Sequence, residues 1–311
     1  MTYSIVARDA SSGQIGVAVQ SHALAVGRSV PWVEAGVGAV ATQALTNASF
    51  GPRGLELLRV GRDPADVVAE LLASDDRPEL RQVAVIDRHG STAAATGTSC
   101  VPFAGHMAGS DYSVQGNMLA SDGCLDAMAM QYEQSAVAEL PLSERLLQAL
   151  EAAEAAGGDV RGRQGAAILI ANPTPEPAPW RGITLDIRLV DHPDPVGELR
   201  RLVNLSESHA LLDDDVADAS RPRIERYREA IARAPEADGL AFRIGIELAN
   251  QGDLEGARRE MRVAVAADGR WREALRRYDL AGRLTNSVTR RPILDEFGPG
   301  NRMMDAPNLH S

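Results

Sequence analysis

The sequence predicts an α+β fold in which antiparallel sheet is layered with helices, followed by a smaller all-α region. Short segments with period-two alternation of apolar residues, such as Ile15, Val17 and Val19, are bounded by turn sequences and indicate hairpins. Two pairs of segments with helical spacing lie between these hairpins, so few parallel crossovers are available. After Pro195 the pattern is almost entirely helical. This order favours antiparallel sheets over a doubly wound parallel sheet.

The individual elements follow from periodicity and turn residues. Strands are expected at 3–8, 14–20, 31–34, 37–43, 82–86, 92–96, 112–114, 166–170 and 183–190. Helices are expected at 51–60, 64–73, 124–132 and 142–156, the last ending at two consecutive glycines. A stretch rich in glycine and serine precedes residue 112 and is expected to be a loop. Many strands are apolar on both sides, so both faces of the sheets need cover.

Three regions are expected: a first domain at 1–190, a tetratricopeptide-like helical domain at 191–284 and an irregular tail at 285–311. Three positions recur after 34 residues, where Tyr227, Ala230 and Pro235 return as Met261, Ala264 and Gly269. Small residues stand where such a helix–turn–helix repeat needs them, at Gly245, Gly252 and Ala257. Because repeat proteins usually need at least three units, we expect this region to lean on the first domain, on a protein partner or on a second copy in a homodimer.

Charge and composition exclude several classes of function. The 32 basic and 43 acidic residues give a net charge of −11, so nucleic acid is not expected as a partner. All 32 basic residues are arginine, which excludes a Schiff-base lysine and a phosphate-loop lysine. No apolar run approaches the roughly 18 residues of a membrane span. The N-terminus lacks the pattern of a secretory signal, and a cytoplasmic protein without membrane partners is expected.

Metal and cysteine chemistry are not expected, and no cofactor is predicted. Cys100 and Cys124 are too few for a four-ligand zinc site or a disulfide framework. Cys100 and His106 form an alternative nucleophile pair, but a buried cysteine is the commoner role. The segment from Asp191 to Asp194 contains metal-ligand residue types, although capping of the following helix by Asp194 explains it equally well.

Thr2 is the first candidate for chemistry. An initiator methionine is normally removed before a small residue, which would leave Thr2 at the terminus with a hydroxyl nucleophile. Its own α-amine, with a pKa near 7.7–8.0, would serve as the general base. The strand expected at 3–8 would hold this terminus at the end of a sheet.

Several separated motifs carry a resemblance to a known family. Each motif overlaps one of the expected strands. The motifs are Met1-Thr-Tyr-Ser-Ile-Val-Ala-Arg-Asp9, Gly16-Val-Ala-Val-Gln-Ser-His22, Val30-Pro-Trp32, Ala35-Gly-Val-Gly-Ala-Val-Ala-Thr-Gln43 and Tyr112-Ser-Val-Gln-Gly-Asn117. Over roughly residues 1–200 the chain resembles a bacterial and archaeal family catalogued as a domain of unknown function. The fold of that family is placed among the N-terminal-nucleophile (Ntn) hydrolases.

The resemblance implies a four-layer αββα sandwich in which the first strand delivers Thr2 to a cleft. It implies catalytic roles for Thr2, His22 and Asn117. Residues that contact the substrate or the oxyanion would be Ser21, Arg28, Gln43, Asn47, Gln115 and Gly116, with backbone N–H groups between Ala44 and Asn47 forming the oxyanion hole. The expected reaction is hydrolysis of an amide bond in a small molecule.

Three points stay open: the source of positive charge at the nucleophile, a structural role for the polar residues, and a function without catalysis. Proteasome-type members of the fold place a lysine beside the nucleophile, and this chain has none, so either Arg8, Arg28 or His22 supplies the positive charge or the amine relies on hydrogen bonds alone. Each polar residue at a strand end also has a purely structural role available, such as the turn chemistry of Asn117 after Gly116. The second function hypothesis is a non-catalytic scaffold whose helical region recruits a protein partner.

Overall fold

The computed structural model describes residues 2–178, 181–213 and 220–300. The chain divides into two compact units, Met1–Val203 and Asn204–Ser311. The division falls inside helix α5 (Pro195–Leu211) and therefore later than the boundary expected after residue 190. Each unit has its own apolar clusters.

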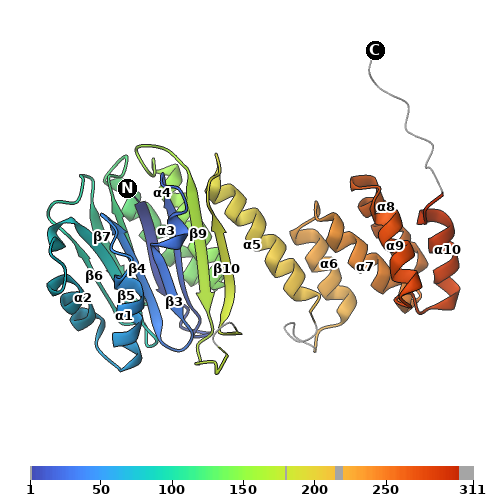
Figure 1. Cartoon of the computed structure of the whole chain (residues 1–311), viewed down its shortest axis with the longest axis horizontal. Helices are drawn as coiled ribbons and strands as arrows, with labels where there is room; N and C mark the ends of the chain where they lie inside the picture. The colour runs from blue at the N-terminus through green and yellow to red at the C-terminus, as the bar shows by residue number, and fades with distance from the viewer. Residues whose placement is uncertain (1, 179–180, 214–219, 301–311) are drawn as a thin grey trace, which may run out of the picture. The chain divides into compact units, whose positions relative to one another are not determined.

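The first unit contains two antiparallel sheets (Figure 1). The six-stranded sheet has the order β10-β9-β2-β1-β8-β7, and the four-stranded sheet has the order β3-β4-β5-β6. The bounds are β1 (Thr2–Arg8), β2 (Ile15–Ser21), β3 (Pro31–Glu34), β4 (Gly38–Ala44), β5 (Arg81–Asp87), β6 (Thr92–Thr96), β7 (Gly105–Gly109), β8 (Tyr112–Asn117), β9 (Gly165–Ala171) and β10 (Ile183–Leu189). The predicted α+β class with antiparallel sheets is confirmed.

Two helix pairs and two short 3-10 segments complete the first unit. The helices are α1 (Phe50–Arg59), α2 (Pro64–Ala73), α3 (Gly123–Val137) and α4 (Leu142–Ala155), and the 3-10 segments are η1 (Val26–Arg28) and η2 (Pro78–Leu80). Helix α2 begins where the pattern predicts, because Asp63 caps it by accepting from the Ala65 N–H and Pro64 occupies its first turn. Strand β7 lies in the predicted loop, since pairing with β8 supplies the extended conformation that its own sequence does not indicate.

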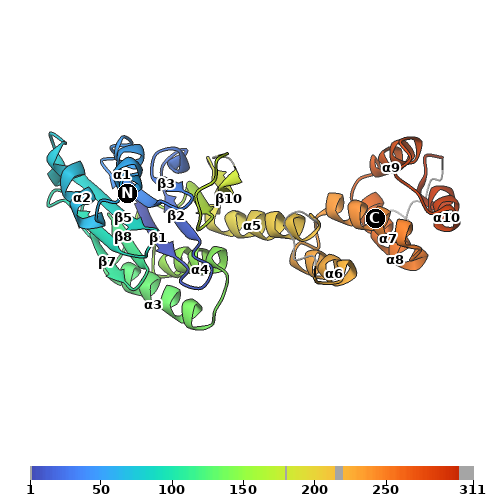
Figure 2. The same cartoon turned by 90° about the horizontal axis from the view of Figure 1, so that it is seen from below.

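Three apolar clusters show which layers meet in the first unit. Alternation along β1 sends Tyr3 and Ile5 toward α3 and α4, and Val6 toward the four-stranded sheet. A third cluster packs α1 and α2 on the outer face of the four-stranded sheet, around Val40 and Leu71. Figures 1 and 2 show one helix pair on each side of the sheets. Strands that are buried on both faces explain why their sequences are apolar on both sides.

The second unit consists of consecutive helices joined by short loops, among which α7 and α8 pack against each other. Its helices are α6 (Arg223–Arg233), α7 (Asp238–Gln251), α8 (Leu254–Ala267), α9 (Trp271–Leu280) and α10 (Ser287–Phe297). A Cβ at Gly245 would lie 3.0 Å from the Met261 Cε, so glycine there permits the close approach of α7 and α8. The repeat-related residues Tyr227 and Met261 are both buried. Within the described residues, every helix is too short or too polar to cross a bilayer.

Helix α10 departs from the irregular tail expected after residue 284. The side chain of Asn286 caps it by accepting from the Val288 N–H, and Ile293 and Phe297, four residues apart, are fully buried. Pro292 lies inside the helix, and this residue made the segment look irregular in sequence. Burial of the Ile293 and Phe297 side chains outweighs the unfavourable effect of Pro292 on the helix. The remaining expected tail residues, 301–311, lie outside the described part of the chain.

Candidate active site

Thr2 begins the central strand of the larger sheet. It pairs with Asn117 on β8, and the next residue, Tyr3, pairs with Gln20 on β2. The Thr2 side chain is only 5% exposed, and its hydroxyl donates to the Ser21 hydroxyl at 3.1 Å. Figure 1 marks the start of the chain beside the ends of these strands. Met1, whose removal is expected, lies outside the described residues.

Polar side chains fill the space between the two sheets at the end where Thr2 lies. Because side chains alternate along β1, Thr2 and Ser4 point toward the four-stranded sheet. That sheet contributes Gln43 from β4 and Gln82 from β5. From β8 come Gln115 and the partner of Thr2, Asn117. All of these side chains belong to residues that are at most 5% exposed. The structure thus brings together Thr2, Ser21, Gln43, Gln115 and Asn117, as the sequence predicts.

These amides form one hydrogen-bonded network. The Ser4 hydroxyl donates to Gln43 Oε1 and accepts from Gln115 Nε2, each at 2.6 Å. Gln43 Nε2 donates to Gln82 Oε1 at 2.7 Å and lies 3.4 Å from the Thr2 carbonyl oxygen. Because the network is buried and its groups are mutually satisfied, it holds the strand carrying Thr2 rigidly against the second sheet.

Gln82 is the residue that sequence reasoning missed at this site. Its Oε1 accepts from both Gln43 Nε2 and Asn117 Nδ2, the latter at 2.9 Å. Its Nε2 donates to the Gly116 carbonyl at 2.7 Å and to the Thr96 hydroxyl at 2.8 Å. One signal was available: Gln82 is a polar residue at the start of an apolar strand that pairs, in register, with Gln43.

Gly116 acts through its backbone. Its carbonyl accepts from Gln82, and a Cβ at this position would lie 2.7 Å from Leu119 Cδ1. Glycine is therefore required where β8 passes Leu119, and Gly116 holds the network in place without offering a side chain to a substrate.

A buried carboxylate lies just beyond the start of β1. Asp159 Oδ2 accepts from the His22 N–H at 2.8 Å, directly after β2 ends, and pairs with Arg161 at 3.2 Å. Asp159 also bridges to Leu119, two residues after β8 ends. Since β1 lies between β2 and β8, Asp159 spans the end of β1. No local pattern in the loop after α4 pointed to this placement.

Of the three expected sources of positive charge, Arg8 and Arg28 lie away from Thr2, whereas His22 directly follows Ser21, the hydrogen-bond partner of Thr2. Arg8 is at the far end of β1, roughly 20 Å from Thr2 at strand spacing, and pairs with Asp111. Arg28 is exposed on η1. The Nδ1 atom of His22 lies beside Gly162, whose Cβ would be 3.9 Å away. Arg161, paired with Asp159, is a guanidinium near the start of β1, and Arg163 pairs with Glu154, the acceptor of the Tyr3 hydroxyl.

Asn47 belongs to a structured loop, and its side chain is engaged by loop partners. Its Nδ2 donates to Asp75 at 2.7 Å and its Oδ1 accepts from the Ser49 hydroxyl at 2.7 Å. The Leu45 N–H, within the stretch expected to form an oxyanion hole, donates to the Leu80 carbonyl instead. The structure therefore engages part of this stretch in loop packing.

Backbone strain collects around the same strand ends. Five non-glycine residues in the described chain have positive φ, and three of them lie at this end: Ala44 is the last residue of β4, and Ala25 and Met118 come after β2 and β8. Each such conformation costs of order 1 kcal/mol and persists only where the surroundings impose it. Strain of this kind is common at functional sites.

The alternative nucleophile and metal sites find no support in the geometry. Burial raises the pKa of the Cys100 thiol, against a hydrogen bond that lowers it, and the Cys100 Sγ faces the Arg81 carbonyl at 3.4 Å. His106 instead contacts the Thr96 hydroxyl at 2.9 Å. Across the described residues, no group of three or more His, Cys, Asp and Glu side chains is arranged to hold a metal ion.

Comparison with known proteins identifies the family. The model of the DUF1028 family, described as a family of unknown function, matches residues 2–199. The chain belongs to the DUF1028 family. This confirms the family resemblance carried by the sequence motifs, and the match ends within α5, where the first unit ends.

Solved structures include a second member of DUF1028. The crystal structure of protein SPO2555 from Silicibacter pomeroyi is 32% identical, with a TM-score of 0.59, over 68% of this chain and 90% of that chain. Anbu (ancestral beta-subunit) from Yersinia bercovieri is 14% identical with a TM-score of 0.32, over 65% of this chain and 92% of that chain. The second likeness is too weak to bear on function. A search of curated proteins finds no match.

Proposed function

We propose that the chain is an Ntn-type hydrolase that cleaves an amide bond of a small molecule, with Thr2 as its nucleophile after removal of Met1. The observation that carries the proposal is the position of Thr2. Its hydroxyl is buried at the start of the central strand, hydrogen-bonded to Ser21 and backed by an amide network. A structural threonine at a chain terminus has no need of such a setting.

The layer order of the first unit supports the same reading. Helix pair, sheet, sheet and helix pair follow one another through three apolar clusters. We propose that this arrangement is the four-layer αββα sandwich of Ntn hydrolases, with the tetratricopeptide-like helices as a separate domain.

The proposed reaction passes through an ester. The Thr2 Oγ forms a bond to the substrate carbonyl carbon while its proton moves to the α-amine of the same residue. The C–N bond then breaks, and the leaving amine takes that proton. Water attacks the ester next, gives its proton to the α-amine, and releases the acid as the proton returns to Oγ. Asn117 Nδ2 is a neutral donor near this point, whereas Gln43 Nε2 is engaged by Gln82 and by the Thr2 and Gln115 carbonyls and so positions Thr2.

Asp159 and Arg161 have a positioning role in this proposal. A carboxylate beside the start of β1 would hold the α-amine of Thr2 in one orientation, and the paired guanidinium would offset the tendency of that carboxylate to keep the amine protonated. Arg161 would thus act in place of the lysine that this chain lacks.

Intact mass and substitution test the proposal. The proposal requires that purified protein has lost Met1, because a retained methionine would block the α-amine of Thr2. In a screen of neutral acyl amides for amine release at pH 7–9, Thr2→Ala should turn over at least about 10³-fold more slowly than wild type, with stability changed by less than about 0.5 kcal/mol. Thr2→Ser should keep partial activity. If Thr2→Ala turns the substrate over at the wild-type rate, Thr2 is not the nucleophile.

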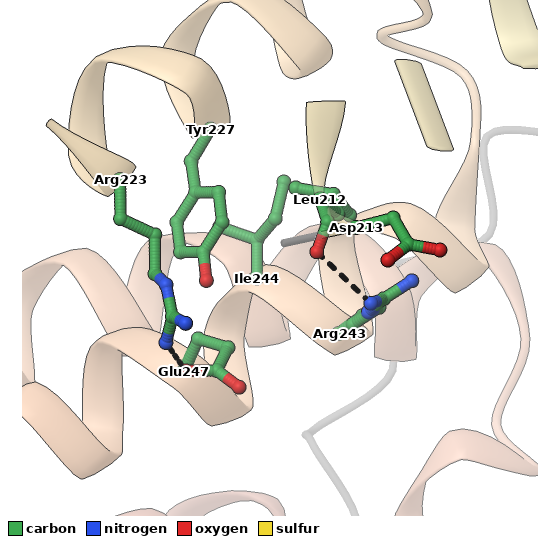
Figure 3. A pocket seen from close by; sticks show the side chains of 7 residues that line it. All are labelled: Leu212, Asp213, Arg223, Tyr227, Arg243, Ile244 and Glu247. Carbon is green, nitrogen blue, oxygen red and sulfur yellow. Dashed lines mark hydrogen bonds and ion pairs between the residues drawn. The ribbon is translucent and has the colours of Figure 1, made fainter. Parts of the chain in front are cut away.

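The runner-up function, recruitment of a partner by the helical domain, is favoured by one observation. A pocket of about 260 Å³ in the second unit is lined by side chains of both charges (Figure 3): Leu212, Asp213, Arg223, Tyr227, Arg243, Ile244 and Glu247. Arg243 donates to the Leu212 carbonyl at 3.1 Å, and Arg223 pairs with Glu247 at 3.4 Å. If purified protein retains Met1, this candidate takes precedence, and Arg243→Ala should reduce binding to peptides displayed on an array.

A further inference from the structure

Exposed apolar side chains surround the end of the first unit where Thr2 lies. We name them the apolar collar: Leu24, Leu45, Val101, Phe103, Val160 and Val190. Each is between 45% and 65% exposed. Single exposed apolar residues are normal on a protein surface, whereas a group on one end indicates a binding surface.

Strand register places every member of the collar at this end. Leu24, Leu45 and Val190 follow the last residues of β2, β4 and β10. The carbonyls of Val101 and Phe103 accept from the N–H groups of Met118 and Leu119, directly after β8. Val160 is in the loop that crosses the end of β1, next to Asp159.

The opposite end of the same sheets has a different surface. Its loops are 9–14, 35–37, 88–91, 110–111 and 172–182. Within their described residues, none of the exposed large apolar side chains occurs. The strand loops at the two ends therefore differ, and the exposed apolar side chains nearest the opposite end, Val60 and Val137, stand on helix ends.

A shallow pocket of about 590 Å³ lies between the end of β6 and the start of β7, and Phe103 of the collar is among its lining residues. Its lining includes Thr96, Cys100, Pro102, Phe103 and His106, and none of its lining residues has a carboxylate or a guanidinium. Burial lowers the pKa of His106, which favours the neutral imidazole. A ligand with a fixed charge would find no counter-charge in this lining.

The pocket is connected to Thr2 by distance and by hydrogen bonds. Strand β7 is two strands from β1 in the sheet, roughly 10 Å at ordinary strand spacing. The Thr96 hydroxyl at the pocket accepts from Gln82, and Gln82 accepts from Asn117, the strand partner of Thr2. The pocket therefore lies two strands from Thr2, a separation that an extended acyl amide can span.

We infer that the pocket between Thr96 and His106, with the apolar collar around it, binds an uncharged apolar group of the substrate, so that the amide cleaved at Thr2 carries a medium-length acyl chain. This inference rests on the proposed function for the role of Thr2. The binding site itself depends only on the collar and the neutral lining, and it can be tested without turnover.

Binding of three acyl glycinamides to full-length Thr2→Ala protein tests the inference. The probes are N-octanoyl-, N-acetyl- and N-succinyl-glycinamide, titrated by saturation-transfer NMR. We expect the octanoyl compound to bind at least about tenfold more tightly than either the acetyl compound or the anionic succinyl compound. Equal or tighter binding of the succinyl compound would overturn the inference. Because this protein lacks the nucleophile, failure of the proposed hydrolysis would leave the result unaffected.

Substitutions locate the site. Phe103→Ser should weaken octanoyl binding by about tenfold and Val101→Ser by a smaller factor. Val137→Ser is the matched control, because Val137 is 86% exposed on α3 and outside the collar, and it should leave binding unchanged. Unchanged binding in Phe103→Ser would contradict the inference. So would light scattering that shows a wild-type dimer broken by Phe103→Ser, since the collar would then be a subunit interface.

Discussion

The space between the two sheets is divided into a polar half near Thr2 and an apolar half near the other end. Along β5, Gln82 and Ile86 point into the same layer from the same face, four residues apart. Around Ile86 lie Val6, Val17 and Ala39, whereas around Gln82 lie amides and hydroxyls. Both halves are closed to solvent.

The difference teaches how one layer can combine adaptability with a fixed geometry. An apolar cluster keeps most of its stability when a side chain of similar volume is exchanged, because dispersion contacts have little directionality. A buried amide network has the opposite property, because each group lost leaves partners unsatisfied. The polar half therefore fixes the position of the strand that carries Thr2, and the apolar half supplies the driving force for packing.

Of the substitutions that test this difference, Gln82→Leu should cause the largest loss in the free energy of unfolding. It removes the acceptor of Gln43 and Asn117 and the donor to Thr96, and we expect a loss of about 3 kcal/mol in the free energy of unfolding measured in urea. Combined with Gln43→Leu, the effects should fail to add by about 1 kcal/mol, since the two side chains touch. A loss below 1 kcal/mol would show that the network is not needed for stability.

Asp9→Asn probes the turn at the far end of β1. Burial tends to raise the pKa of Asp9, but hydrogen bonds from Ser12 and Ser11 lower it to about 2, from an ordinary 3.8. Because the folded pKa is the lower one, the carboxylate contributes about 2 kcal/mol above pH 4, and this contribution is lost as pH falls toward 2.

Unfolding in urea at pH 5 and pH 2 measures this contribution of Asp9. Wild type should lose about 2 kcal/mol more than Asp9→Asn between the two pH values. The variant also removes the charge facing Arg145. Parallel pH profiles would contradict the prediction. Turnover at Thr2 should be unaffected at pH 7, since the turn lies at the other end of the strand.

Ile86→Val gives the smallest effect. Removal of one methylene from the apolar half should cost about 1 kcal/mol in urea unfolding and leave turnover unchanged. It should add to Gln82→Leu within about 0.5 kcal/mol, because the two side chains share no hydrogen-bond partner. A change in turnover would mean that the two halves are coupled.

The sequence predicts most of the strands because alternation along each chain segment survives in the folded sheets. It predicts the meeting of Ser21, Gln43 and Asn117 because all three stand at strand ends. Gln82 was missed because a lone polar residue at a strand start has a simpler explanation, and its role depends on pairing with β4.

The other misses have the same physical origin. Asp159 is placed beside the start of β1 by its contacts with residues that follow β2 and β8, which no local pattern encodes. Arg8 was assigned to the wrong end because the strand direction separates residues that are near in sequence. Strand β7 and helix α10 take their conformation from their packing partners.

The absence of lysine has a practical consequence for the start of β1. In this sequence the α-amine is the sole aliphatic primary amine, so acylating reagents such as succinimidyl esters can modify it selectively among nitrogen groups. Labelling of the folded protein should therefore reach one nitrogen, at the start of a strand that is paired on both sides with β2 and β8. The pH dependence of that reaction would give the ionisation of the terminal amine directly, with no substrate and no background from side-chain amines.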